Sequence, residues 1–151
     1  TPDYDWERVD FWVNEGPAVL KNNGKIFIAF SASATGACYC MGYMEADENS
    51  DLLDRNSWTK TRMPVLETSV DKKIFGPGHN CFTVAEDGET PLCIYHARDY
   101  EHAVGEPSVV PKTDTRPLEE IVKDPLYDPN RHARVMEVKY DENGRPLFEL
   151  Y

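Results

Sequence analysis

The chain has 151 residues, and its 40% of hydrophobic and 28% of charged residues are typical of one globular domain. Lys and Arg number 16 and Asp and Glu number 27, so the formal net charge is −11, which repels the phosphate backbone of nucleic acids. No apolar stretch reaches the roughly 18 residues that a membrane-spanning helix needs. We therefore expect no nucleic acid and no membrane as partners, and a neutral substrate fits this charge better.

The first half of the chain predicts a small antiparallel meander. The Asn23-Gly24 step lies between two apolar runs, which is a strong signal for a hairpin with a tight turn. The polar stretch 49–58 predicts a surface loop or one short helical turn. The strands expected in this half cover residues 9–13, 18–20, 25–30 and 37–44.

The second half predicts further hairpins joined by a long loop. The Asp87-Gly88 step is turn chemistry, and residues 99–129 hold many prolines and charges with little periodicity, apart from a helical turn at 118–123. The expected strands cover residues 80–85, 91–97, 133–140 and 146–148. Repeated small antiparallel sheets with long connections indicate an all-β fold, either a β-propeller or a sandwich, between which periodicity alone does not choose.

The four cysteines form no Cys-x-x-Cys pair, so a structural zinc site is unsupported. Cys38 and Cys40 are two residues apart in an expected strand, which would point both to one face. We expect free, largely buried thiols, and such cysteines favour a cytoplasmic over a secreted protein.

The segment Asn14-Glu15-Gly16-Pro17 places a carboxylate at the end of an apolar run. Glycine permits a close backbone approach and proline fixes the turn. Partial desolvation would raise the pKa of Glu15, which is what a general acid near neutral pH requires. The alternative is a solvated glutamate in a surface loop.

Two other segments are candidates for chemistry. In Gly76-Pro77-Gly78-His79-Asn80, a rigid bend leads the histidine to a fixed place, where it is a metal ligand, a substrate donor or a satisfied core residue.

The segment 128–135 (DPNRHARV) carries Arg131 where a loop enters a strand, and a guanidinium there grips hydroxyls or makes a surface ion pair. We interpret 95–98 (YHAR) as mainly structural.

The order of these motifs, NEGP, an aromatic hairpin, GPGHN, YHAR and NRHARV, resembles the glycoside hydrolases of family 43. The segments FSASATGACYCMGYM and FGPGHNCF resemble its α-L-arabinofuranosidase branch more closely. The resemblance extends over about residues 10–148. It implies the C-terminal part, about blades three to five, of a five-bladed β-propeller with its active site at the mouth of the central channel.

The resemblance also implies roles for single residues. Glu15 matches the general acid, and His79 matches the channel histidine that in many members helps hold a calcium ion or water. Arg131 matches the arginine that contacts the sugar, a role for which Arg134 fits less well. The aromatic residues Trp12, Phe11 and Phe30 would be sugar-facing or part of the core.

The implied activity is inverting removal of terminal α-L-arabinofuranosyl residues from plant polysaccharides such as xylan. The substrate would be an arabinose- or xylose-containing oligosaccharide. The alternatives are a β-xylosidase or arabinanase of the same family, or a non-catalytic carbohydrate-binding propeller.

Residues 1–151 would form a partial catalytic domain that lacks its N-terminal blades. The chain begins with Thr1 rather than Met, which favours a processed product or a piece of a longer protein. In this family the catalytic base and the acid that tunes the general acid's pKa lie on blades before the acid. We therefore expect the isolated chain to be inactive and to need a complementary N-terminal propeller segment as its partner.

Overall fold

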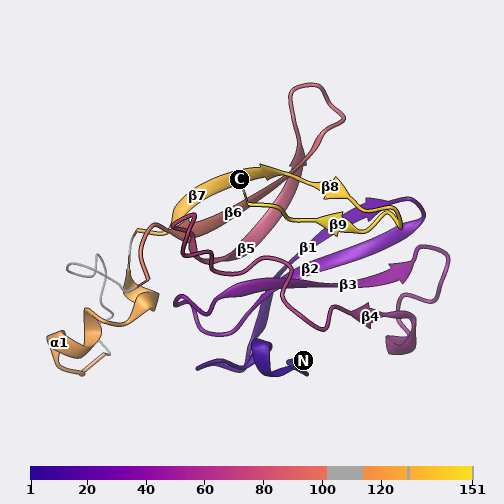
Figure 1. Ribbon diagram of the computed structural model, residues 1–151. Coiled ribbons are helices and arrows are strands. Elements are labelled where there is room, and N and C mark those ends of the chain that lie inside the picture. The colour runs from indigo at the N-terminus through magenta and orange to yellow at the C-terminus, as the bar shows by residue number, and fades with distance from the viewer. Residues whose placement is uncertain (102–113, 129, 151) are drawn as a thin grey trace.

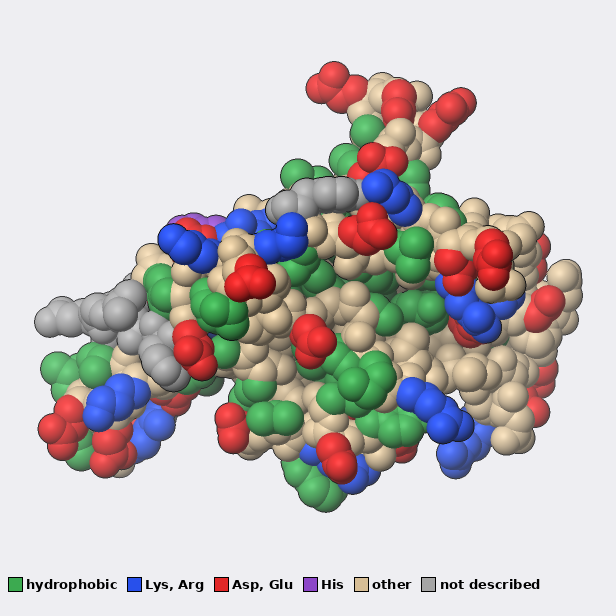
Figure 2. Space-filling model, viewed as in Figure 1, with side chains coloured by type: hydrophobic (Ala, Val, Ile, Leu, Met, Phe, Trp, Pro, Cys, Tyr) green, Lys and Arg blue, Asp and Glu red, His purple; other side chains and the backbone are tan. Residues whose placement is uncertain are grey.

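The computed structural model describes residues 1–101, 114–128 and 130–150. Its regular structure is almost entirely β, in two antiparallel sheets and a two-stranded ribbon (Figure 1), which confirms the all-β prediction. Among the described residues no helix is long and apolar enough to cross a membrane. Acidic side chains are spread over the visible face and gather at the tip of a projecting hairpin (Figure 2).

The first sheet has the order β1-β2-β3-β4 and follows a short 3-10 turn, η1 (Asp5–Glu7). Asn23 and Gly24 join β1 to β2 with φ angles of +48° and +73°, the left-handed backbone that a tight hairpin turn requires. The predicted hairpin with its Asn-Gly turn is therefore confirmed. The strands are β1 (Asn14–Asn22), β2 (Lys25–Ala32), β3 (Cys40–Asp47) and β4 (Thr59–Lys60).

The second sheet has the order β5-β6-β7, and the β5–β6 turn is the projecting hairpin of Figure 1. The expected strand 133–140 is divided at Val138, which is 2% exposed and donates its N–H to Pro91 O at 2.9 Å. The strands are β5 (Phe75–Val84), β6 (Pro91–Arg98), β7 (His132–Glu137), β8 (Lys139–Tyr140) and β9 (Pro146–Leu147). The remaining helical turns are η2 (Arg55–Ser57), α1 (Leu118–Ile121) and η3 (Pro125–Tyr127).

Two local predictions are wrong. Residues 9–13 are irregular rather than a strand, because Asp10 takes a φ of +60° and Phe11 bonds back to Val9 O at 2.7 Å. Cys38 lies in a turn before β3, so it does not share a strand face with the buried Cys40. The helical turn expected within the long loop is present as α1, and residues 102–113 of that loop lie outside the described residues.

The main core lies between the two sheets. It takes aromatic and aliphatic side chains from β2 and β3 on one side and from β6 and β7 on the other, all less than a tenth exposed. This packing fixes the distance between the sheets. The strand members of the core are Phe27, Ala29, Met41, Tyr43, Cys93, Tyr95, Ala97 and Met136.

Arg98 at the end of β6 anchors the loops beside the core. Its guanidinium is 2% exposed and bonds to Asp128 at 2.7 Å, to Thr35 O at 2.7 Å and to Pro125 O at 2.6 Å. Because the buried charge is both paired and hydrogen-bonded, it ties η3 to the segment before β3.

Glu7 holds the N-terminal segment against the first sheet. Its carboxylate is fully buried, accepts from Lys60 Nζ at 2.8 Å and from the N–H groups of Asp3 and Tyr4 at 2.6 and 2.8 Å, and accepts from Asn14 Nδ2 at 3.0 Å. Burial alone would raise the pKa of Glu7, but Lys60 and the backbone donors outweigh it and hold the pKa below its ordinary value. The bond to Asn14 fixes the start of β1.

We expect Glu7→Gln to lower the free energy of unfolding at pH 7 by about 2 kcal/mol, because Lys60 loses a buried counter-charge. A carboxylate whose pKa is lowered by folding stabilises above its unfolded pKa and loses that contribution as pH falls. The variant should therefore be less acid-sensitive than the native protein as the pH falls below about 4.5, the ordinary glutamate value, as urea unfolding measures. Glu86→Gln, at an exposed turn, is the control, and equal acid sensitivity of native protein and Glu7→Gln would contradict the account.

Candidate active site

A β-bulge positions Glu15. The register pairs Glu15 with Ser31 and then Ala18 with Ala29, so Gly16 and Pro17 together oppose a single residue of β2. Gly16 has a φ of +58°, a conformation that other residues adopt at a cost. Such a bulge turns the preceding side chain away from its regular strand direction, and Glu15 is left 38% exposed.

The Glu15 carboxylate belongs to a three-residue cluster. The Tyr39 hydroxyl donates to Glu15 Oε1 at 2.6 Å and lies 3.4 Å from His79 Nδ1, which is itself 3.9 Å from Glu15 Oε1. Burial raises the pKa of Tyr39, and its hydrogen bond to Glu15 raises it further. Tyr39 is therefore a permanent neutral donor toward the carboxylate at physiological pH.

The Gly76-Pro77-Gly78-His79 segment of β5 allows Tyr39 to lie where it does. A Cβ at Gly78 would come within 2.3 Å of Tyr39 Cε1, and one at Gly76 within 2.3 Å of Gly36 O. His79 has a φ of +51° and donates its N–H to Ser31 Oγ at 2.6 Å. The two glycines are therefore required by close approach, and this brings β5 against the first sheet.

His96 of β6 stacks on the Tyr39 ring of this cluster. Its ring is parallel to that of Tyr39 within 2°, at 5.6 Å between centroids, and lies 6.3 Å from that of His79. Burial and, next to it, the positive charge of Arg131 together lower the pKa of His96 to about 4. A neutral ring there stacks on Tyr39 without adding charge beside Glu15.

Tyr39 and His96 were not among the predicted site residues. Tyr39 was placed inside a predicted strand. His96 belongs to the 95–98 segment, which was interpreted as mainly structural, and that interpretation agrees with the buried Arg98 and its bond to Asp128. The paired glycines at 76 and 78 were the available signal, because such spacing indicates that another group approaches the backbone.

Arg131 lies on the same side of the molecule as this cluster. It is half-buried, and its guanidinium is 3.5 Å from Leu126 O. Its charge contributes to the lowered pKa of His96 and only weakly opposes the raised pKa of Tyr39. The structure therefore brings Glu15 and His79 together, with Arg131 close enough for its charge to act on His96.

Two of the three aromatic candidates for sugar contact, Phe30 and Trp12, lie in different environments. Phe30 is 5% exposed, stacks on Trp6 at 6.1 Å and has Lys60 Nζ 5.3 Å from its ring. Trp12 is 73% exposed, with the Arg8 guanidinium 4.7 Å from its ring. Phe30 and Glu15 border one cavity of about 170 Å³, whereas Trp12 lies on the outer surface.

The described residues do not by themselves make a metal site. No group of three or more His, Cys, Asp or Glu side chains in residues 1–101, 114–128 and 130–150 is arranged to hold an ion. Calcium prefers six to eight oxygen ligands, which the surroundings of His79 do not supply. A calcium role for His79 stays a prediction.

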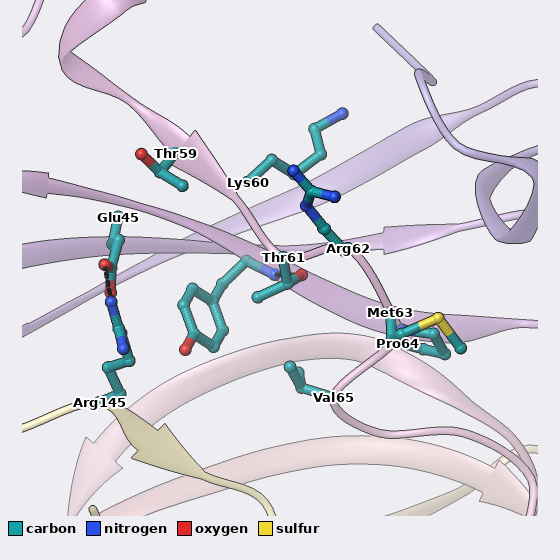
Figure 3. Close-up of a pocket in the computed structure, with 10 residues that line it drawn as sticks. Glu45, Thr59, Lys60, Thr61, Arg62, Met63, Pro64, Val65 and Arg145 are labelled. Carbon is teal, nitrogen blue, oxygen red and sulfur yellow. Dashed lines mark hydrogen bonds and ion pairs between the residues drawn. The ribbon is translucent and has the colours of Figure 1, made fainter. Parts of the chain in front are cut away.

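A larger groove of about 440 Å³ lies elsewhere, beside the end of β3, β4 and the segment 61–65 (Figure 3). Glu45 and Arg145 face each other at one end, joined by hydrogen bonds of 2.8 and 2.9 Å, and Met63, Pro64 and Val65 lie at the other. None of the predicted site residues lines it, so cavity size alone does not select the site around Glu15.

Comparison with known proteins agrees with the motif order. The sequence model of the glycosyl hydrolases of family 43 matches residues 2–146. The extracellular exo-α-(1→5)-L-arabinofuranosidase of Streptomyces avermitilis is 43% identical over 99% of this chain, and that of Streptomyces chartreusis is 52% identical over 71% of it. The crystal structure of an α-L-arabinofuranosidase from Lactobacillus brevis superposes on 98% of the chain with a TM-score of 0.81 and 47% identity.

The chain spans only part of each of these proteins: 27% and 33% of the two Streptomyces enzymes and 40% of the Lactobacillus chain. These relatives are five-bladed β-propellers, so the two sheets described above are part of a propeller, and the sandwich alternative is excluded.

The expectation of a cytoplasmic protein is wrong, because the names of the two Streptomyces relatives place them outside the cell. All four cysteines are free in the structure, but this does not require a reducing compartment. Burial raises the pKa of Cys40 and of Cys93 to about 12, so neither is a reactive thiolate.

We expect the His96 ring to titrate with a midpoint near pH 4, as followed by NMR of its ring protons and assigned with His96→Gln. Folding lowers this pKa. Between about pH 6.5 and pH 4, His96 is therefore mostly protonated in the unfolded chain and mostly neutral in the native protein. The free energy of unfolding should therefore decrease as the pH is lowered from about 6.5 to about 4. A midpoint at the ordinary histidine value would contradict the burial described here.

Proposed function

The chain belongs to glycosyl hydrolase family 43, and on that premise we propose that it is the acid-bearing part of a secreted, inverting exo-α-L-arabinofuranosidase. The substrate class is an arabinofuranosyl-substituted oligosaccharide or polysaccharide. The names of the relatives at 39–52% identity support arabinofuranosyl over xylosyl specificity, and two of them support secretion.

The observation that carries this proposal is the state of the Glu15 carboxyl. One oxygen, Oε1, is held by the Tyr39 hydroxyl at 2.6 Å, while the side chain remains 38% exposed. A carboxyl fixed at one oxygen and open at the other is suited to deliver a proton in a defined direction. Glu15 would protonate the glycosidic oxygen as the bond to the arabinofuranosyl carbon breaks.

An inverting glycosidase needs a second carboxylate roughly 6.5–9.5 Å from the acid, with a water molecule between it and the sugar. Two acids that precede Glu15 are already engaged, since Asp3 and Glu7 are ion-paired with Lys60 at 2.9 and 2.8 Å. We propose that the base comes from the part of the relatives' length that this chain does not span.

The guanidinium of the half-buried Arg131 would bind sugar hydroxyls beside the acid. The contribution of its charge to the low pKa of His96 supports this role. In this arrangement Glu15 moves the proton, Arg131 orients the ring, and the cavity bordered by Phe30 supplies an apolar wall.

In the complete protein, Glu15→Gln should reduce kcat on an arabino-oligosaccharide by roughly 10²–10⁴-fold, because the amide cannot donate the proton that the leaving oxygen needs. Initial rates of arabinose release measure this, with Glu86→Gln as the control. A carbohydrate-binding propeller would show no turnover before the change and unchanged sugar affinity after it, which would refute the enzymatic role.

The 151-residue chain alone should not hydrolyse 4-nitrophenyl α-L-arabinofuranoside above the buffer rate, because it lacks the base. Adding the complementary N-terminal segment should restore turnover. Clear hydrolysis by the purified chain without that segment would show that the base lies within residues 1–151.

A further inference from the structure

The contacts of Tyr39 go beyond those of a core aromatic residue. Its side chain is 1% exposed, yet its hydroxyl reaches the partly exposed Glu15 at 2.6 Å. Three groups fix the ring: the parallel His96 ring at 5.6 Å, the backbone of Gly78, and the hydroxyl's own contact with His79 Nδ1 at 3.4 Å. A ring confined on so many sides holds its hydroxyl at one point.

The hydrogen bond has a defined direction. Because the hydroxyl has one proton and donates it to Glu15 Oε1, its own oxygen is free to accept from His79 Nδ1 when that nitrogen carries the ring proton. Within the described residues Oε2 makes no hydrogen bond, so it is the oxygen left to carry the acidic proton. The bond therefore distinguishes the two oxygens of the carboxyl.

We propose that Tyr39 is a positioning residue for the general acid, whose hydroxyl holds Glu15 Oε1 so that Oε2 presents its proton to the leaving glycosidic oxygen. This inference rests on the function proposed above. Tyr39 touches neither the sugar nor the broken bond in this scheme, and it acts only through Glu15.

A positioning role predicts an effect that depends on the leaving group. A dinitrophenolate departs without a proton, whereas the alcohol of an arabino-oligosaccharide must be protonated as its bond breaks. Misorienting the acid should therefore slow the oligosaccharide and spare the dinitrophenyl arabinofuranoside. A change that merely loosened the fold would slow both substrates equally, so the ratio of the two rates does not depend on the fraction of folded enzyme.

The experiment uses the complete protein and its Tyr39→Phe variant, with kcat measured on both substrates. We expect a loss of about 10- to 100-fold on the oligosaccharide and less than about 2-fold on the dinitrophenyl substrate, a part of the range that general acid catalysis spans. Tyr95→Phe is the matched control, because Tyr95 is a buried tyrosine of β6 in the core between the sheets, and its ratio should equal that of the native enzyme.

Gly78→Ala tests the same geometry while keeping the hydroxyl. The new Cβ would fall 2.3 Å from Tyr39 Cε1 and 2.6 Å from Cδ1, so the ring must move and the hydroxyl with it. This variant should show the same selective loss as Tyr39→Phe.

Equal slowing of both substrates by Tyr39→Phe, or no slowing of either, would overturn the positioning role while leaving the proposed function intact. Failure of the native protein to hydrolyse either arabinofuranoside would instead refute the proposed function, and the positioning role with it. The two failures are therefore separate results of one set of measurements.

Discussion

The site depends on the close approach of the β5 backbone to the Tyr39 ring. Only glycine at position 78 leaves room for that ring, and Gly76 likewise leaves room for Gly36 O. Once the ring is in place, its hydroxyl can reach Glu15 and its face can stack on His96. A steric constraint in the second sheet thus determines an electrostatic contact at the edge of the first.

Two buried ion pairs fix the segments that flank this contact. Glu7 pairs with Lys60 and binds Asn14, the residue before the acid, while Arg98 pairs with Asp128 and holds the carbonyl of Thr35. Each charge is hydrogen-bonded on several sides, which is what makes such burial tolerable. The irregular segments 1–13 and 33–39 are therefore held in place without sheet hydrogen bonds.

Much of this arrangement could be predicted from the sequence, and the exceptions have physical reasons. The Asn23-Gly24 turn was predictable because its chemistry is local and both residues take a left-handed φ. The motif order indicated Glu15 and His79, and their Oε1 and Nδ1 atoms lie 3.9 Å apart. The predicted strand at 9–13 is absent. Its apolar side chains face solvent, with Phe11 67% exposed, so the apolar composition did not indicate strand pairing there. Tyr39 was not predicted because its position depends on Gly78, which lies 39 residues further along the chain, and no local sequence pattern links the two.

The site is also divided along the chain in a way that affects biosynthesis. Glu15, Ser31 and Tyr39 come from the first 40 residues, whereas Gly78, His79 and His96 come from a sheet made later. On the ribosome Glu15 therefore emerges well before the residues that confine Tyr39, and pairings so distant in sequence form slowly. A nascent chain that has reached only β4 contains Glu15 and Tyr39 but not Gly78, His79 and His96, so docking of the second sheet completes the surroundings of the Tyr39 ring.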